Sequence, residues 1–257
     1  MRFFIEVSYK GTAYSGFQIQ RNANSIQAEV EKALLIYCKK AIALTGSSRT
    51  DAGVHALQNF FHFDSDEFPS NSSGLHGLNS ITPLSNCVYH LNAILPHDIA
   101  IARIFEVNSE AHCRFDAHSR EYHYKIYQQK NPFFEQTAYH YPYTLDVEKM
   151  NKAAALVLGE KDFTSFSKKN TQVKHFMCRV MKSEWAWQNE MLVYTVKANR
   201  FLRGMVKGLV GTMLRVGTQK NSVEEFGKII ESRDCRRADF SVPSHGLFLV
   251  KVKYDEI

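Results

Sequence analysis

An α+β fold with two α/β halves, each built on mainly antiparallel sheet, is what this sequence predicts. Segments in which apolar and polar residues alternate are interleaved with segments whose apolar residues recur at helical spacing. Residues 183–198 have the pattern of a hairpin, which favours antiparallel pairing. The strand pattern is interrupted between residues 107 and 114. We therefore expect an N-terminal domain at residues 1–107 and a C-terminal domain at residues 108–257, with a cleft between them.

The first half is expected to combine strands with one helix. Ile5, Val7 and Tyr9 alternate with polar residues, which is typical of a strand. Ser25 stands where it can cap a helix, and the apolar residues after it fall on one helical face. The expected elements are a strand at residues 2–9, a helix that starts after Ser25, an aromatic-rich strand at residues 57–63, a polar loop at residues 64–75 and a strand at residues 100–107.

The second half is expected to open with an alternating strand at residues 120–128. Ser222 and Glu225 have the spacing of a capping box, which predicts the start of a helix. The remaining elements are helices at residues 146–158 and 222–232, the hairpin at residues 183–198 and a last strand at residues 246–254.

The charges of the chain point to an anionic partner mainly through their distribution. Lys and Arg total 32 against 26 acidic residues, a formal charge of +6. Residues 191–222 contain no acidic residue, and a partner with closely spaced negative charge would interact with this segment first. The basic residues there are Lys197, Arg200, Arg203, Lys207, Arg215 and Lys220.

Part of this basic segment, residues 200–214, is predicted to form a helix with two faces. At helical spacing, Arg200, Arg203 and Lys207 lie on one face, and the apolar residues share the opposite side. The basic face either binds the anionic partner or is simply solvated, and the pattern alone does not separate these alternatives.

Three glycines, at positions 204, 208 and 211, lie beside the charges of this predicted helix. Each costs roughly 0.5–1 kcal/mol in a helix relative to alanine, so their presence needs a reason. Close approach of another backbone, of protein or of nucleic acid, would supply one.

The cysteines and the N-terminus favour a cytoplasmic protein without a structural metal. The five cysteines are far apart, and none has the spacing of a zinc-ligand pair. His55 and His62 flank an expected strand, but no third ligand stands at a suitable spacing from them. The first residues lack the apolar core of a signal peptide, and no later run is apolar enough to cross a membrane.

The segment at residues 47–55 carries the candidate chemistry. It is rich in small residues and stands between an expected helix and an expected strand, as a loop that passes close to another group would. Arg49 and Asp51 are two residues apart, so a curled loop can bring both side chains to one site. A cation beside a carboxylate keeps it ionised, as a nucleophile requires, although an ordinary surface pair has the same spacing.

Seven blocks of the sequence, in order, carry a resemblance to a known family. They are YKGTAYSGFQIQ at residues 9–20, SSRTDAGVHA at 47–56, LNAILPHDIAI at 91–101, AHCRFDAHSREYHYKIY at 111–127, DFTSFSK at 162–168, FLRGMVKGLVGTML at 201–214 and PSHGLFLVKVKY at 243–254. Together they resemble the tRNA pseudouridine synthase A family over almost the whole chain. The resemblance implies the pseudouridine synthase fold, with a central cleft between its two halves.

The resemblance also implies roles for particular residues. Asp51 matches the essential aspartate of the family, and Arg49 matches the arginine that fills the space left by the extruded base. Tyr122 matches the tyrosine that stacks on the target uracil, and Lys207 matches the basic residue that pairs with the catalytic carboxylate. Two positions depart from the family pattern, because Ser48 replaces the usual glycine and Lys207 replaces the usual arginine, which keeps the charge but loses the bidentate fork.

The implied activity is isomerisation of uridine to pseudouridine at nucleotides 38–40 of the tRNA anticodon stem-loop. An isomerisation needs no redox cofactor or energy source, so no cofactor is expected. Arg200 and Arg203 are expected to bind RNA phosphates, and the resemblance implies a homodimer. The alternatives are the same reaction on a different or narrower set of RNAs, prompted by Ser48 and Lys207, and a catalytically silent RNA-binding protein.

Overall fold

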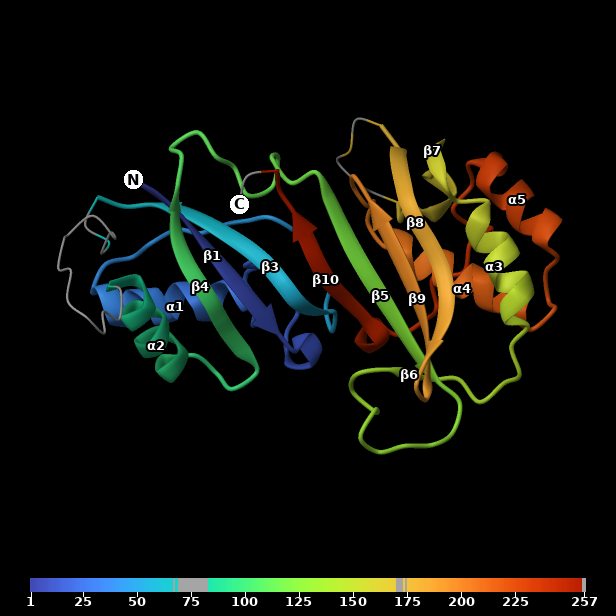
Figure 1. Ribbon diagram of the computed structural model, residues 1–257, viewed down its shortest axis with the longest axis horizontal. Coiled ribbons are helices and arrows are strands. Elements are labelled where there is room, and N and C mark those ends of the chain that lie inside the picture. The colour runs from blue at the N-terminus through green and yellow to red at the C-terminus, as the bar shows by residue number, and fades with distance from the viewer. Residues whose placement is uncertain (67, 69–82, 170–172, 174, 256–257) are drawn as a thin grey trace. The chain divides into compact units, whose positions relative to one another are not determined.

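The computed structural model describes residues 1–66, 68, 83–169, 173 and 175–255. The expected polar loop at residues 64–75 lies mostly outside the described residues. The chain divides into two compact units, of which the first is Met1–His118 with Tyr254–Ile257 and the second is Ser119–Lys253. Each unit combines helices with a mostly antiparallel sheet, so the expected α+β class is confirmed (Figure 1).

The first unit is built on a sheet in the order β4-β1-β3, with the short β2 paired to β3. All of these pairs are antiparallel, and β1 is central; its consecutive Phe3, Phe4 and Ile5 are fully buried, so both faces of this strand are covered. The strands are β1 (Arg2–Tyr9), β2 (Thr45–Gly46), β3 (His55–Asp64) and β4 (Ile99–Val107), and the helices are α1 (Ile26–Cys38), α2 (Pro83–Ile94) and the 3-10 turn η1 (Gly11–Ala13).

Helix α1 begins where the sequence predicts, because the hydroxyl of Ser25 accepts a hydrogen bond from the backbone N–H of Ala28 at 3.3 Å. The helix buries Ile26, Val30 and Leu34. In Figure 1, α1 and α2 lie along the same face of the first sheet.

The end of the chain returns to the core of the first unit through Tyr254. Its ring meets Phe60 edge-on, with centroids 5.2 Å apart, and lies 5.8 Å from that of Phe4. Its hydroxyl donates to the carbonyl of Cys113 at 2.6 Å. The loop around Cys113 is thereby tied to the aromatic core.

The second unit is built on a sheet in the order β10-β5-β9-β8-β7. These neighbours are antiparallel, and β6 pairs with β5 in parallel. The strands are β5 (Ser119–Tyr127), β6 (Tyr139–His140), β7 (Gly159–Asp162), β8 (Met177–Gln188), β9 (Met191–Ala198) and β10 (Leu247–Lys253), and the helices are α3 (Val147–Ala155), α4 (Met205–Gly217), α5 (Val223–Ser232) and the 3-10 turns η2 (Thr164–Phe166) and η3 (Ser244–Gly246).

Helices α3, α4 and α5 pack together beside this second sheet (Figure 1). Trp185 of β8 links two of them to the sheet, because its indole N–H points to the sulfur of Met213 at 3.3 Å and its backbone exchanges two hydrogen bonds with Asn151, at 2.8 and 3.0 Å. The capping box that the sequence predicts for α5 is present, with Ser222 and Glu225 as its two members.

The prediction of a helix over residues 200–214 is wrong at its start. Helix α4 begins at Met205, so Arg200 and Arg203 lie in the connection that precedes it, and only Lys207 stands on the helix. The residue before the helix, Gly204, has φ +75°, a left-handed conformation that a right-handed helix cannot contain. The three basic residues therefore do not share a helical face.

The sequence patterns did not predict helix α2.

The structure explains two of the three glycines in the basic segment. A Cβ at Gly211 would overlap the carbonyl oxygen of Asp239, and one at Gly208 would lie 2.8 Å from the ring of Phe240. Close approach of the protein's own chain at residues 239–240 thus accounts for these two glycines.

In the described residues, no helix is both long and apolar enough to cross a membrane.

Candidate active site

The loop between β2 and β3 is held to the first unit through alternate residues. Ser48 and Thr50 are buried, at 6% and 7% exposure, whereas Arg49 and Asp51 are exposed. Because buried and exposed residues alternate from Ser48 to Asp51, the two side chains with candidate chemistry point away from the core. The loop thus presents Arg49 and Asp51 on a fixed support.

Hydrogen bonds provide that support. The carboxamide of the fully buried Asn59 donates to the carbonyl of Ser48 at 2.9 Å and to the hydroxyl of Tyr9 at 3.1 Å. The hydroxyl of Tyr9 in turn bonds the hydroxyl of Thr50 at 2.8 Å. The carbonyl of Thr50 accepts the backbone N–H of Phe17 at 3.1 Å. Sequence reasoning missed Asn59 and Tyr9, because only the pairing of β1 with β3 brings them under the loop.

Glycine at position 16 allows this close approach. Gly16 has φ +120°, and a Cβ there would lie 3.1 Å from the carbonyl oxygen of Thr50. The next residue, Phe17, is 1% exposed and stacks on Phe61 with ring centroids 4.5 Å apart. The Gly-Phe pair of the opening block therefore packs against the candidate loop.

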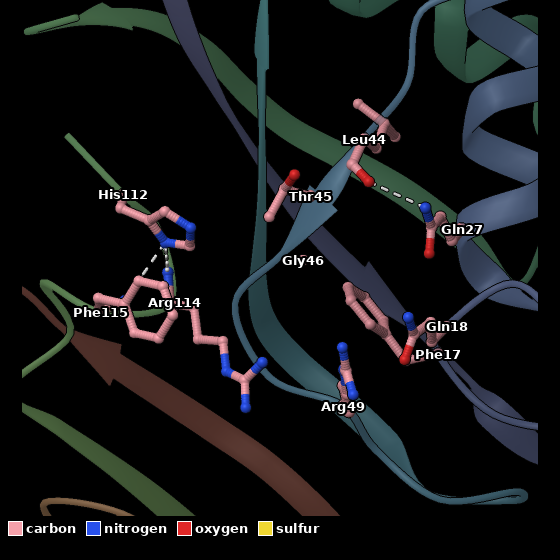
Figure 2. Close-up of a pocket in the computed structure, with 10 residues that line it drawn as sticks. All are labelled: Phe17, Gln18, Gln27, Leu44, Thr45, Gly46, Arg49, His112, Arg114 and Phe115. Carbon is pink, nitrogen blue, oxygen red and sulfur yellow. Dashed lines mark hydrogen bonds between the residues drawn. The ribbon is translucent and has the colours of Figure 1, made fainter. Parts of the chain in front are cut away.

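Arg49 and Asp51 do not form an ion pair with each other in the described part of the first unit. The spacing of Arg49 and Asp51 predicts a cation beside the carboxylate, and within this unit Arg49 does not fill that role. Arg49 instead lines a pocket together with Gln18, His112 and Arg114 (Figure 2).

His55 and His62 have separate structural surroundings. The ring nitrogen Nδ1 of the buried His55 accepts the backbone N–H of Gly11 at 3.1 Å, which holds the turn after β1. His62 lies against Cys113, with Nδ1 3.1 Å from the sulfur. Burial and, to a lesser extent, the neighbouring His112 lower the pKa of His62 to about 4, so the ring is neutral at pH 7.

His62, His112 and Cys113 form a group whose possible ligand atoms all lie within 4.8 Å of one another. The sequence offered His62 no third ligand, and the loop after β4 supplies two from about fifty residues away. Hydrogen bonds already engage a ring nitrogen or the sulfur of each of the three residues, and Nδ1 of His62 accepts the backbone N–H of Cys113 at 3.4 Å. The Cys113 thiol donates to the carbonyl of Thr45 at 3.2 Å, and Nδ1 of His112 accepts the N–H of Arg114 at 3.1 Å. We therefore interpret the group as a hydrogen-bonded link between the loop after β4 and strand β3.

Tyr122 lies in the second unit, at the middle of β5. It pairs with Leu249 of β10 and Val196 of β9, and its side chain is buried. Its ring meets Phe201 edge-on, with centroids 4.9 Å apart. Phe201 thereby connects Tyr122 to the basic segment that leads into α4.

Lys207 projects from the first turns of α4 towards the turn η3. Its Nζ lies 3.4 Å from the hydroxyl of Ser244. The adjacent His245 is partly buried, which lowers the pKa of its imidazole, and the positive charge of Lys207 adds to this effect. A neutral His245 beside an ammonium group suits a positioning role for this turn.

Arg200 and Arg203 lie in the connection between β9 and α4, at the same end of the second unit as Phe201. Arg200 is half-buried, with one guanidinium nitrogen 3.2 Å from Nε2 of His175. The side chain of Arg203 is exposed, while its carbonyl accepts the N–H of Lys168 at 2.9 Å. Phe201, which packs on Tyr122, stands between Arg200 and Arg203 in the sequence of this connection.

Comparison with known proteins defines first a class and then a family. Residues 153–255 match the family described as "tRNA pseudouridine synthase". Proteins named "tRNA pseudouridine synthase A" are similar over nearly their full length. The one from Porphyromonas gingivalis is 43% identical over 98% of this chain and 97% of its own. That from Parabacteroides distasonis is 40% identical over 99% and 96%, and that from Staphylococcus aureus is 36% identical over 100% and 93%.

Identity at this level over almost the whole of both chains establishes common descent and a common fold. The chain belongs to the tRNA pseudouridine synthase A family.

Proposed function

We propose that this protein isomerises uridine to pseudouridine in the anticodon stem-loop of tRNA, at nucleotides 38–40, with Asp51 as the attacking carboxylate. Membership of the family makes the protein an isomerase that acts on tRNA. The stem-loop and the role of Asp51 rest on the sequence resemblance and on the geometry of the loop.

The observation that carries the proposal is the presentation of Asp51. Its carboxylate is exposed on a loop whose neighbouring residue, Thr50, is buried and hydrogen-bonded on both its hydroxyl and its carbonyl. A nucleophile must be accessible to its substrate and yet held in place, because a misplacement of about 1 Å can cost about 100-fold in rate. The loop meets both requirements.

The reaction itself explains why a carboxylate is needed and why a cofactor is not. The bond between C1′ and N1 of uridine breaks, the uracil turns, and C5 bonds to C1′ while its proton is lost and N1 gains one. Asp51 can start this sequence by attacking C1′ or C6, or by removing a ribose proton. Each route uses an ionised carboxylate and leaves the enzyme unchanged at the end.

The remaining residues suit the handling of an extruded nucleotide. A base within a stem must leave the stack, which costs a few kcal/mol. Stacking of the uracil on Tyr122 would return roughly 1–3 kcal/mol of this cost. Arg49 would fill the space left by the base, Lys207 would pair with the carboxylate, and Arg200 and Arg203 would bind phosphates.

The test is a comparison of the wild type with Asp51→Asn on unmodified tRNA, followed by mapping of pseudouridine. We expect product at nucleotides 38–40 with the wild type and none with Asp51→Asn. Glu190→Gln, which removes one negative charge at the exposed turn between β8 and β9, is the matched control and keeps full activity. Product formation by Asp51→Asn at the wild-type rate would remove Asp51 from the mechanism.

The same assay separates the alternatives. Product at other nucleotides, or in only a few tRNAs, would indicate a different or narrower set of RNAs, for which Ser48 and Lys207 are the first residues to examine. RNA binding without product in either protein would indicate a silent RNA-binding protein. We further propose a cytoplasmic homodimer, and gel filtration with light scattering measures the mass that decides the oligomeric state.

A further inference from the structure

The first unit contains a pocket beside the 47–55 loop. The roles proposed above do not say what this pocket binds. Its volume is about 240 Å³. This is smaller than the about 300–1,000 Å³ typical of sites that enclose a drug-sized ligand, so the pocket suits no more than parts of a single nucleotide. The described residues that line it are Phe17, Gln18, Gln27, Leu44, Thr45, Gly46, Arg49, His112, Arg114 and Phe115 (Figure 2).

The charge of the pocket favours an anion. Two guanidinium groups, those of Arg49 and Arg114, lie along its lower rim as drawn in Figure 2, and none of the described lining residues is acidic. The nearby carboxylate of Asp116 accepts the backbone N–H of His112 at 2.7 Å and is not among the described lining residues. Arginine pairs are well suited to phosphate, which they can bind through two parallel hydrogen bonds.

The aromatic wall of the pocket is exposed and yet held in place. Phe115 is 73% exposed, and its ring packs on His112 with centroids 4.2 Å apart. His112 packs in turn edge-on against the buried His62, at 4.6 Å. The Nδ1 atom of His112 accepts the N–H groups of Arg114 and Phe115, at 3.1 and 3.4 Å, which fixes the turn that carries them.

An exposed aromatic ring beside arginine side chains is the combination that single-stranded nucleic acids recognise, through stacking of a base and pairing with a phosphate. The guanidinium of Arg114 already lies over the ring of Phe115, at 5.6 Å from its centroid. A preformed wall of this kind loses little conformational entropy when a base stacks on it.

We infer that this pocket binds the nucleotide next to the target uridine, with its base against Phe115 and its phosphate between Arg49 and Arg114. The inference rests on the proposed function. Arg49 is two residues from Asp51, which limits their Cα separation to at most about 7 Å. A nucleotide held at Arg49 is therefore a close neighbour of the uridine that meets Asp51. Enzymes that extrude a base obtain their sequence context from such flanking nucleotides.

The experiment uses the full-length chain with Asp51→Asn as the background, so that binding is measured without turnover. Anticodon stem-loop RNAs with a normal base or an abasic site on either side of the target uridine are titrated against Phe115→Ala and Phe115→Trp. Phe115→Ala is expected to weaken binding about 5- to 150-fold, the equivalent of one stacked base, and Phe115→Trp to restore it. Phe133→Ala, which removes an 88% exposed ring from the second unit, is the matched control and leaves affinity unchanged.

The abasic RNAs show which base the pocket holds. An abasic site at the stacked position is expected to weaken binding to the parent protein and to cancel the further effect of Phe115→Ala, because both changes remove the same contact. Arg114→Gln is expected to reduce the slope of log affinity against log salt by about 0.7, the value for one phosphate contact on a single strand. Circular dichroism confirms that each variant is folded.

Three outcomes would overturn the inference: Phe115→Ala binding as tightly as Phe133→Ala, full additivity of the two losses at both flanking positions, or an unchanged salt slope in Arg114→Gln. Its failure differs from failure of the proposed function. If the wild type makes pseudouridine while these variants bind normally, only the pocket assignment fails. If the wild type makes no pseudouridine, the proposed reaction fails whatever the pocket binds.

Discussion

Removal of the buried amide under the 47–55 loop tests the link between packing and activity. In Asn59→Ala the chain loses three hydrogen bonds, to the carbonyl of Ser48, the hydroxyl of Tyr9 and the backbone N–H of Phe60, at 2.9, 3.1 and 2.9 Å. A hydrogen bond contributes roughly 0.5–1.5 kcal/mol to stability, and more when its loss leaves a buried group unpaired. We therefore expect the free energy of unfolding of Asn59→Ala to fall by about 2–4 kcal/mol.

The same substitution should slow catalysis under conditions in which the protein remains folded. Ser48 and Thr50 are the buried anchors on either side of Arg49, and Asn59 holds the first directly and the second through Tyr9. Loosening them displaces the candidate carboxylate, and about 1 Å of displacement can cost about 100-fold in rate. Urea unfolding followed by circular dichroism measures the stability, and single-turnover pseudouridine formation at saturating tRNA measures the rate.

Gln58→Ala is the control, because it removes an amide from the adjacent position of β3. That amide donates to Glu6 at 2.9 Å on a half-exposed face. We expect it to change stability by less than about 1 kcal/mol and to leave the rate near that of the wild type. An Asn59→Ala protein that unfolds like the wild type, or that loses stability without any loss of single-turnover rate, would refute the anchoring argument.

Two further substitutions test other parts of the structure. Lys207→Ala should lower the single-turnover rate about 10- to 100-fold, as expected for the loss of one charge-assisted interaction, and should change tRNA affinity far less. The rate of Lys207→Arg should stay within a few-fold of the wild-type rate. A large loss of affinity with an unchanged rate would contradict this role. Gly211→Ala should destabilise the second unit by roughly 1–3 kcal/mol despite the higher helix propensity of alanine, because the new Cβ would overlap the carbonyl oxygen of Asp239. A raised melting temperature would show that position 211 has room for a Cβ.

Elements that depend on local signals were predictable. The alternation at residues 2–9, the cap at Ser25 and the capping box at Ser222 each involve neighbours in the sequence, and the structure confirms β1, α1 and α5 at these places. The start of α4 was not predictable from periodicity, because the residues before Met205 keep helical spacing and only the left-handed backbone at Gly204 ends the pattern. Helix α2 was missed altogether.

Contacts between distant residues were beyond the reach of the sequence. His62 had no third potential ligand within a local spacing, yet the loop after β4 brings His112 and Cys113 to it. The pocket that Arg114 and Phe115 line together with Arg49 depends on the same loop. Arg114 and Phe115 belong to one of the sequence blocks that resemble the family, but the resemblance assigned no role to either residue.

By itself, the sequence determined the fold class, the family and the loop that carries Asp51, because hydrophobic periodicity, capping and ordered motifs are all written along the chain. The tertiary structure alone decided that Ser48 and Thr50 anchor this loop, that Arg49 turns to a pocket instead of pairing with Asp51 within the first unit, and that an exposed aromatic ring stands across that pocket. These features depend on which strands pair and which loops meet. Such pairings join residues that are tens of positions apart, so no local pattern encodes them.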